Sequence, residues 1–407
     1  MSDSSKKEGI IIVSGGLMQI PAVLTAKRLG LFTIATDGNP NAAAFKHADL
    51  GVPIDTRDIP NTVKFAVENR ERYNIKAVFA GADVPVEVAH IAKALNLPGI
   101  PVEVAERSHS KALMKERWLR DGIPTPKAIE VGTLKEAQLA LKEIGLPAMV
   151  KAIDNAASRG SKKIVHENEL EEALKNAKAA SSTSRALIEQ YVTGTEQSVE
   201  TIVWNGRHYH CGMADRQFGY HPYHIETAHV DPSELPAETQ RRIYEVVDAA
   251  ADSLGINFGP AKADMMLTEK GPIIIEMPAR LSGGFHSQYT TPLSTGRDPI
   301  RAVMEISLGR KLDESLITPS KSNVAICSGI FPPPGRLKAV HGVDAAKAIK
   351  GVEQILITKR PGEIIEPLID NGKRVCWIIT VGKSKAEAQA IFAQVKETIR
   401  FEVEPLR

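Results

Sequence analysis

Two carboxylates in the segment KADMMLTEKGPIIIEMPAR, residues 262–280, are spaced so that they could hold a metal ion. Apolar runs flank positions 269–271, and glycine in the third of these positions favours a hairpin with a three-residue loop. Such a loop places Asp264 directly opposite Glu276, with β-carbons about 4.5–5.5 Å apart. Two like charges in that position repel each other, and a cation between them removes the conflict.

The cation expected at this pair is magnesium. Carboxylate oxygens favour hard ions, and magnesium typically takes one or two protein carboxylates together with the phosphate oxygens of a nucleotide. Lys262 lies on the same predicted face as the two acids, and the alternative interpretation is an exposed acidic pair that this lysine neutralises. The residues predicted to face a core are Ala263, Met265, Ile273, Ile275 and Met277.

A second candidate site is the cationic loop in LPAMVKAIDNAASRGSKK, residues 146–163. Lys151 ends a predicted buried strand, where a lysine is costly without an anionic partner. Arg159, Gly160 and Ser161 belong to a loop of small residues and cations, which suits a polyphosphate bound by backbone N–H groups and positive side chains. The alternative is a solvated basic turn.

A third candidate is the interrupted strand ALIEQYVTGTEQSVETIV, residues 186–203. The break at 193–195 would present backbone groups and the Glu196 carboxylate to one ligand, although Glu189 and Glu196 could equally be strand-edge charges. Further along, His224 and Glu226 are predicted wall residues of a substrate pocket, with an ordinary polar strand as the alternative. The histidines between positions 208 and 229 match no tetrahedral zinc spacing.

The elements that must position these residues fall into three stretches. The apolar run 10–13 is followed by a glycine turn and a helical pattern, and the same order recurs at LFTIATDGN and AVFAGAD. This alternation predicts a parallel, doubly wound sheet. The composition changes near residue 105, a charged helix is predicted over 108–122, and a last stretch with a helix from about Ser384 begins near residue 320.

Composition limits the class of protein. The 407 residues are enough for two to three domains at about 150 residues each. The net charge of +2 gives no bulk field for nucleic acid or an anionic membrane, so neither is expected as a partner. Three scattered cysteines favour a reducing compartment, and the polar first ten residues favour a cytoplasmic protein without a signal peptide. The cysteines are Cys211, Cys327 and Cys376.

In the order of these motifs, the chain resembles the ATP-grasp superfamily, and the resemblance covers nearly the whole length. It implies an α/β and α+β multidomain protein with three domains. These are an N-terminal doubly wound domain at 1–105, an ATP-grasp domain at 106–319 with a lid at about 125–195, and a small C-terminal domain at 320–407. The family's common E-x-N-x-R segment reads Glu276-Met277-Pro278-Ala279-Arg280 here, without the amide that often helps to bind a second magnesium.

The resemblance also implies residue roles. Lys111 and Lys151 would hold nucleotide phosphates, with Arg159, Gly160 and Ser161 in the loop that closes over them. Glu189, Gln190 and Val192 would form the hinge that meets adenine, and Glu196 would bind the ribose. Asp264 and Glu276 would bind Mg²⁺ or Mn²⁺, and Arg280 and Lys262 would act on the reacting phosphoryl group. Near the acyl group, Gly283 and Gly284 would let the backbone approach, and Ser282 and His286 are candidate contacts, with a simple tight turn as the alternative.

The implied activity is that of an ATP-dependent carboxylate-amine ligase. Such an enzyme activates a small, amino-acid-like carboxylate as an acyl phosphate and joins it to an amine, releasing ADP and phosphate. Two alternatives stay open, namely an ATP-dependent carboxylase that uses bicarbonate and a nucleotide-binding regulator without turnover. The expected partners are the small-molecule carboxylate and amine, and a second copy of the chain in a homodimer.

Overall fold

The computed structural model describes residues 6–406, and its N-terminal part is the predicted parallel sheet. The strand order is β3-β2-β1-β4, and the strands are buried apolar runs, which parallel sheets covered on both faces require. The strands are β1 Gly9–Val13, β2 Phe32–Thr36, β3 Leu50–Val52 and β4 Ile75–Phe79. The helices are α1 Ile20–Arg28, α2 Ile59–Asn69, α3 Pro85–Ala94 and α4 Val102–His109, with 3₁₀ turns η1 Leu17–Gln19 and η2 Ala43–Lys46.

The predicted helix over 108–122 is wrong in one respect, because the chain breaks it at Ser110. This residue has an extended backbone and its hydroxyl accepts from the Leu113 N–H at 3.4 Å, which makes it the N-cap of a new helix, α5 Lys111–Arg120. A single residue, Ser110, therefore separates the end of α4 from the start of α5. The break lets α5 start with Lys111 at its first position, next to the sheet that carries the predicted phosphate loop.

The predicted lid region is a separate antiparallel sheet of order β5-β8-β6-β7. A capping box between Thr133 and Glu136 starts one of its two covering helices. The strands are β5 Ala128–Val131, β6 Ala148–Ala152, β7 Lys162–Ile164 and β8 Ala186–Gln190, and the helices are α6 Leu134–Ile144 and α7 Leu170–Ala180, with the 3₁₀ turn η3 Glu167–Glu169. The apolar faces of sheet and helices form one core, so this unit has its own hydrophobic interior.

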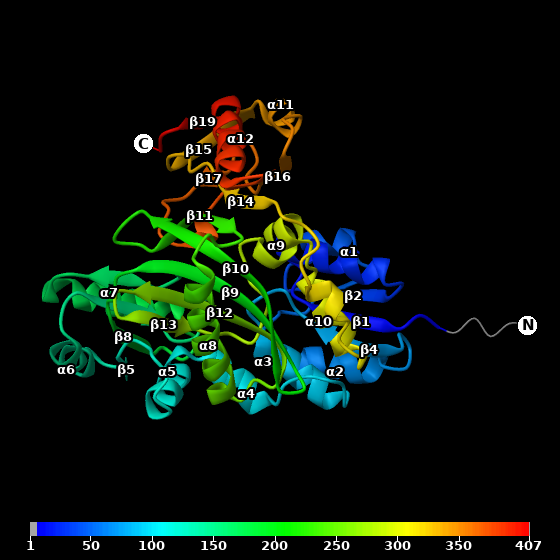
Figure 1. The fold of residues 1–407 in the computed structure, drawn as a ribbon, viewed down its shortest axis with the longest axis horizontal. Coiled ribbons are helices and arrows are strands. Elements are labelled where there is room, and N and C mark those ends of the chain that lie inside the picture. Colours follow the sequence, from blue (N-terminus) through cyan, green and yellow to red (C-terminus); the bar gives the residue numbers. More distant parts are fainter. Residues whose placement is uncertain (1–5, 407) are drawn as a thin grey trace, which may run out of the picture.

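A long antiparallel sheet crosses the middle of the molecule in the order β13-β12-β9-β10-β11-β14-β18-β16 (Figure 1). Its first five strands are β9 Thr195–Trp204, β10 Arg207–Gly219, β11 Ile225–Asp231, β12 Phe258–Thr268 and β13 Gly271–Glu276. The associated helices are α8 Ala237–Leu254, α9 Thr291–Thr295 and α10 Pro299–Ser307, with a π-helical turn η4 His286–Thr290 and the 3₁₀ turn η5 Glu314–Ile317. Helix α10 packs on β4 and α1, so the N-terminal and central parts share a core.

The last stretch extends this sheet and adds a second one. Strands β14 Val324–Ser328, β16 Val352–Ile357 and β18 Cys376–Gly382 join the central sheet through the β11–β14 pair, so the sheet continues across the predicted boundary at residue 320. The remaining elements are β15 Gly335–His341, α11 Val343–Lys347, β17 Ile364–Ile365, the 3₁₀ turn η6 Asn371–Lys373, α12 Lys385–Thr398 and β19 Arg400–Glu404. The exact domain limits stay predictions.

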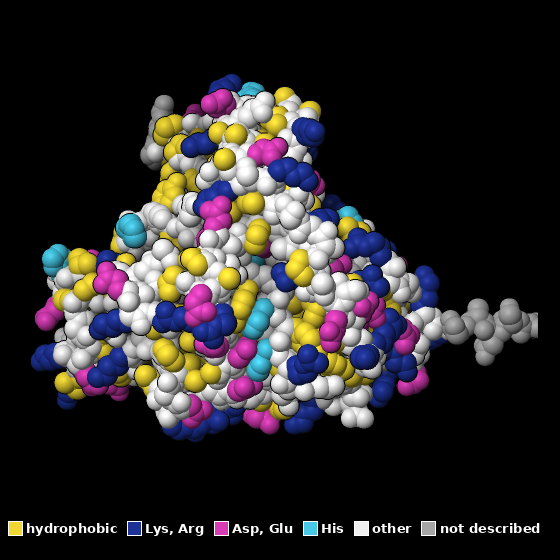
Figure 2. Space-filling view, in the orientation of Figure 1, with side chains coloured by type: hydrophobic (Ala, Val, Ile, Leu, Met, Phe, Trp, Pro, Cys, Tyr) yellow, Lys and Arg dark blue, Asp and Glu magenta, His cyan; other side chains and the backbone are white. Residues whose placement is uncertain are grey.

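Two whole-molecule observations concern the described part of the chain. None of its helices combines the length and the apolar character that crossing a membrane would need. The face seen in Figure 2 carries Lys and Arg side chains interspersed with Asp and Glu, without one large patch of a single sign.

Candidate functional site

The hairpin of β12 and β13, here called the acidic hairpin, pairs Asp264 with Glu276 as predicted, but its loop length and register differ from the prediction. The loop has two residues, Glu269 and Lys270, so Thr268 pairs with Gly271 and the strands run one residue out of the expected register. A bulge after Asp264 restores that register and brings the two carboxylates opposite each other. The shift also exchanges faces on β13, because Ile274 is fully buried, whereas the predicted core residues Ile273 and Ile275 are only partly buried.

Cations surround both acids of the pair. Lys262 contacts Asp264 directly, the Arg216 Nη1 atom lies 2.5 Å from the Asp264 Oδ1 atom, and the Lys111 Nζ atom lies 3.2 Å from the Glu276 Oε2 atom. Burial raises the pKa of Asp264. Burial would do the same to Glu276, but Lys111 and Lys262 hold the pKa of that carboxyl well below its usual value. Glu276 therefore stays ionised, as a metal ligand must.

The acidic pair fits a magnesium ion that is shared with a polyphosphate. Within residues 6–406, no three His, Cys, Asp or Glu side chains form a cluster that could hold an ion on their own. The site instead has two carboxylates with three cations beside them. This arrangement is expected for a magnesium ion whose other ligands are the phosphate oxygens of a substrate, because the negative charge of the phosphates balances the cations.

One of the predicted phosphate lysines, Lys151, lies beside a buried carboxylate. Lys151, in β6, contacts one oxygen of Glu189, and the Lys115 Nζ atom lies 3.0 Å from the other. Sequence reasoning missed Lys115, although it stands one helical turn after Lys111 on α5. Glu189 itself is almost fully buried between the two lysines, so its carboxylate organises these cations, and its role toward adenine stays a prediction.

The predicted hinge follows directly after these residues. Gln190 ends β8 with an exposed side chain, its N–H donates to the Lys127 carbonyl at 2.8 Å, and Val192 is half-buried. Glu196 is the second residue of the next strand, β9, and the His224 Nε2 atom lies 2.7 Å from its Oε1 atom. The strand interruption predicted from 193–195 is thus present, while the contacts with adenine and ribose stay predictions.

The predicted phosphate loop connects β6 to β7 and is fastened at several points. The Lys111 Nζ atom donates to the Asn155 carbonyl at 2.6 Å, and the exposed Arg159 donates to the Asn155 side chain at 2.7 Å. Gly160 has φ 69°, and a Cβ there would come within 2.6 Å of the Ala180 Cβ atom, so packing on α7 demands glycine. Ser161 follows it, half-buried.

The predicted substrate wall contains an arginine that the sequence analysis did not single out. The Arg216 Nη2 atom lies 2.9 Å from the Glu226 Oε2 atom, and the same guanidinium contacts Asp264 and comes within 4.0 Å of Glu196. The His229 Nδ1 atom lies 3.3 Å from the other Glu226 oxygen. Arg216, in β10, therefore connects Asp264 of the acidic hairpin to Glu226 of the predicted substrate wall. The spacing of these residues in the sequence does not predict this contact, because they lie on three different strands.

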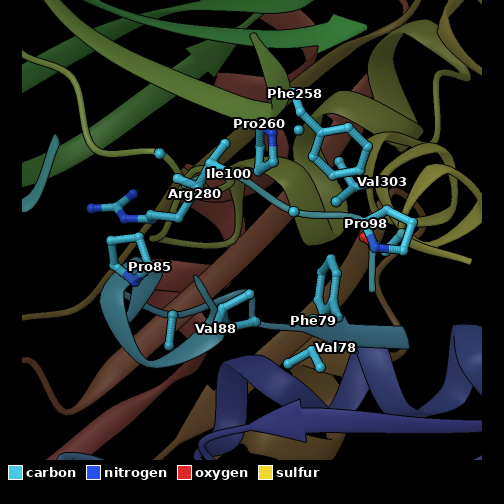
Figure 3. Close-up of a pocket in the computed structure, with 16 residues that line it drawn as sticks. Val78, Phe79, Pro85, Val88, Pro98, Ile100, Phe258, Pro260, Arg280 and Val303 are labelled. Carbon is cyan, nitrogen blue, oxygen red and sulfur yellow. The ribbon is translucent and has the colours of Figure 1, made fainter. Parts of the chain in front are cut away.

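Arg280 follows the hairpin and reaches the N-terminal sheet. Its Nε atom lies 3.2 Å from the Asp83 Oδ1 atom, at the carboxyl end of β4. Burial alone would raise the pKa of Asp83, but the Arg280 guanidinium holds it below its usual value. Figure 3 shows Arg280 and Pro85 at one edge of a largely apolar pocket between the N-terminal and central parts, with Phe79 and Phe258 at the other edge.

The segment after Arg280 lies against buried acids. The Ser282 N–H donates to the Glu200 carboxylate at 3.1 Å, and the His286 Nε2 atom lies 2.9 Å from the Asp231 Oδ2 atom. Both predicted contact residues are almost fully buried. Gly284 has φ 65°, and Gly283 has no atom within 4 Å of an added Cβ, so the turn leaves space beside it. Contact with an acyl group stays a prediction for all four residues.

Comparison with known proteins identifies two domains within the chain. Residues 144–288 match the model of the ATP-grasp domain, and residues 329–404 match that of the L-amino acid ligase C-terminal domain 2. The chain is 28% identical over 99% of its length to an uncharacterised protein, y4rH, of Sinorhizobium fredii, covering 84% of that protein. It is also 26% identical over 62% of its length to the alanine–anticapsin ligase of Bacillus subtilis, covering 57% of that enzyme.

The fold agrees with this match. The crystal structure of an L-amino acid ligase from Bacillus licheniformis superposes with a TM-score of 0.83 at 24% identity, over 98% of this chain and 99% of that one. The fold over nearly the whole chain and the match of residues 144–288 to the ATP-grasp domain model define the class of this protein. The prediction of an ATP-grasp ligase is confirmed at this level by the matched ATP-grasp domain and by the characterised relatives, which are ligases.

Proposed function

We propose that this protein is an ATP-dependent carboxylate-amine ligase that activates a small, amino-acid-like carboxylate as an acyl phosphate and joins it to an amine. The observation that carries the proposal is the convergence of the Asp264–Glu276 pair, Lys111 and Arg280 on one buried site. A protein that only binds nucleotides has little need of a buried arginine beside the metal-binding acids.

The cations of this site have a common task. Lys111 and Lys151 bind phosphate oxygens, and the loop from Asp154 to Lys163 closes over them and excludes water, which would otherwise hydrolyse an acyl phosphate. Asp264 and Glu276 hold Mg²⁺, with Mn²⁺ as the alternative ion, and the ion neutralises phosphate charge when bound. Lys262 and Arg216 keep Asp264 in place until then.

The reaction takes place in two steps. A carboxylate oxygen of the substrate attacks the γ-phosphorus of ATP, the bond to the β–γ bridging oxygen breaks, and ADP leaves. The amine nitrogen then attacks the acyl carbon, the bond to the phosphate oxygen breaks, and the nitrogen loses a proton. Arg280 is positioned by Asp83 to stabilise the charge on the transferring phosphoryl group and on the departing phosphate. We propose a homodimer as the assembly.

The proposal is tested by the release of ADP and phosphate from ATP and Mg²⁺ over a panel of amino acids, singly and in pairs, other small carboxylates, and bicarbonate with and without biotin. Release that requires both a carboxylate and an amine is the expected result. Release that depends on bicarbonate would instead identify a carboxylase, and ATP binding without release on the whole panel would identify a regulator.

Glu276→Ala provides a second test of the same site. We expect it to reduce the rate of ADP formation by a factor on the order of 100 or more, while the fold stays intact. This is the size of the loss seen when one charge-stabilising group is removed from an active site. Glu269→Ala is the matched control, because Glu269 is an exposed acid in the loop of the same hairpin. Activity of the Glu276 variant near that of the wild type would overturn the metal assignment.

A further inference from the structure

His224 is paired with the predicted ribose-binding acid, although the sequence predicts it in the wall of a substrate pocket. Its Nε2 atom lies 2.7 Å from the Glu196 Oε1 atom, which is an ion-pair distance. The neighbouring wall residue Glu226 instead contacts Arg216 and His229. The pair is open to solvent, because 32% of the His224 side chain and 14% of the Glu196 side chain are exposed. The two predicted wall residues therefore belong to different groups of contacts.

The His224 side chain is held in place by contacts other than the one with Glu196. Its imidazole lies flat on the Phe218 ring, with the ring centres 3.9 Å apart and the planes 13° apart. Its carbonyl accepts from the Ser158 hydroxyl at 2.8 Å, and Ser158 belongs to the predicted phosphate loop. A solvent-exposed ion pair contributes little when two mobile side chains must be ordered to form it. Here one of the two is already ordered.

The pair leaves the second carboxylate oxygen of Glu196 available to a ligand. The Arg216 Nη1 atom lies 4.0 Å from the Glu196 Oε2 atom, which is beyond hydrogen-bond distance. Glu196 is the second residue of β9 and follows the interruption at 193–195, so its position along the chain is set by the start of that strand. A carboxylate with one oxygen held and the other free presents its free lone pairs in a fixed direction, which suits a hydroxyl donor.

We propose that His224 is a positioning residue that directs the free oxygen of Glu196 toward the 2′-hydroxyl of a bound nucleotide, so that the protein prefers ribonucleotides to 2′-deoxyribonucleotides. This inference rests on the proposed function, in which Glu196 faces the ribose. A nucleotide without the 2′-hydroxyl leaves a charged acceptor without its donor, which is costly. A carboxylate that rotates freely would lose less, because it could turn to the 3′-hydroxyl or to water. His224 itself acts only through Glu196.

The test is a calorimetric titration with ADP and with 2′-deoxy-ADP, each with Mg²⁺. We expect the wild type to bind ADP about 10- to 100-fold more tightly, as for a hydrogen bond to a charged group. In His224→Phe, which keeps a ring to stack on Phe218, the preference should fall below about threefold. His224→Gln keeps a nitrogen donor for Glu196 and should retain a preference above that value. His341→Phe is the matched control, because His341 lies 3.1 Å from Glu402 at an exposed site on β15.

A double-mutant cycle shows whether His224 acts through Glu196. We expect Glu196→Gln to lose the preference and the addition of His224→Phe to change the ratio of the two affinities no further. Equal weakening of both nucleotides in His224→Phe, or no preference in the wild type, would overturn the inference.

These titrations also separate the inference from the proposed function, because ADP binding needs neither the carboxylate nor the amine. A preference that depends on His224, in a protein that releases no ADP on the substrate panel, would support the inference and contradict the ligase function. Ligation together with a preference that is unchanged in His224→Phe would do the reverse.

Discussion

At the scale of single residues, Lys115 is a buried lysine of the site whose charge depends on pH. Burial lowers the pKa of its ammonium from 10.5 to about 8, although Glu189 acts in the opposite direction. Above this pH the cluster around Glu189 loses a positive charge. We expect kcat/KM for ATP to decline above about pH 8, and Lys115→Arg, which stays charged, to move the decline to higher pH. A pH profile of both proteins checks this.

Deprotonation of Lys115 is expected to lower activity but to increase the free energy of unfolding. Between about pH 8 and 10, the unfolded chain still holds the proton that Lys115 has lost in the folded protein. The free energy of unfolding therefore increases with pH in this window as far as Lys115 is concerned. A decline of activity that coincides with unfolding would point to another cause, and an unchanged decline in Lys115→Arg would contradict the assignment.

Residue spacing predicted part of the site and could not predict the rest. The spacing predicts Asp264 opposite Glu276 because the pairing of two strands within a hairpin follows from the length of its loop. The loop is one residue shorter than predicted, and the prediction is correct only because the bulge after Asp264 offsets this difference. Lys115 could have been found from its helical spacing to Lys111. Arg216 could not, because its carboxylate partners stand on three other strands, and strand order does not follow from one sequence.

At the scale of elements, η6 in the C-terminal stretch is hydrogen-bonded to the loop between β6 and β7, which is the predicted phosphate loop. The N–H of Asn371 donates to the Ala157 carbonyl at 2.9 Å, and its side chain donates to the Ser158 hydroxyl at 3.2 Å. That hydroxyl donates in turn to the His224 carbonyl at 2.8 Å. Ala157 and Ser158 both have positive φ, at 60° and 59°, a conformation that persists only where its surroundings hold it.

Removing the Asn371 side chain should therefore loosen the loop. We expect Asn371→Ala to raise KM for ATP about three- to tenfold, with a smaller change in kcat, and to speed tryptic cleavage after the exposed Arg159. Asn323→Ala is the matched control, because Asn323 also makes two side-chain hydrogen bonds between elements, to Leu293 and Lys383, outside this loop. Equal cleavage rates in the two variants would show that Asn371 does not fasten the loop.

At the scale of the whole molecule, the site is completed only where the N-terminal sheet meets the central sheet. The parallel sheet was predicted correctly, because its strands are continuous apolar runs followed by helices. The way this sheet packs against the central part of the molecule was not predicted, because the core that they share includes α10. This helix lies more than two hundred residues further along the chain than β4. The consequence is that Asp83, at the end of β4, reaches Arg280 from a different domain.

This arrangement makes Asp83 a positioning residue for Arg280. Asp83→Asn removes the charge that orients the guanidinium but keeps the size of the side chain, so we expect kcat to fall about tenfold, or about 1.4 kcal/mol, with little change in KM for ATP. Asp58→Asn is the control, because Asp58 is a partly buried cap of α2 in the same N-terminal sheet region and asparagine caps helices equally well. If docking of the two sheets were the only role of Asp83, its variant would instead lose thermal stability, and its activity per folded molecule would equal that of the control.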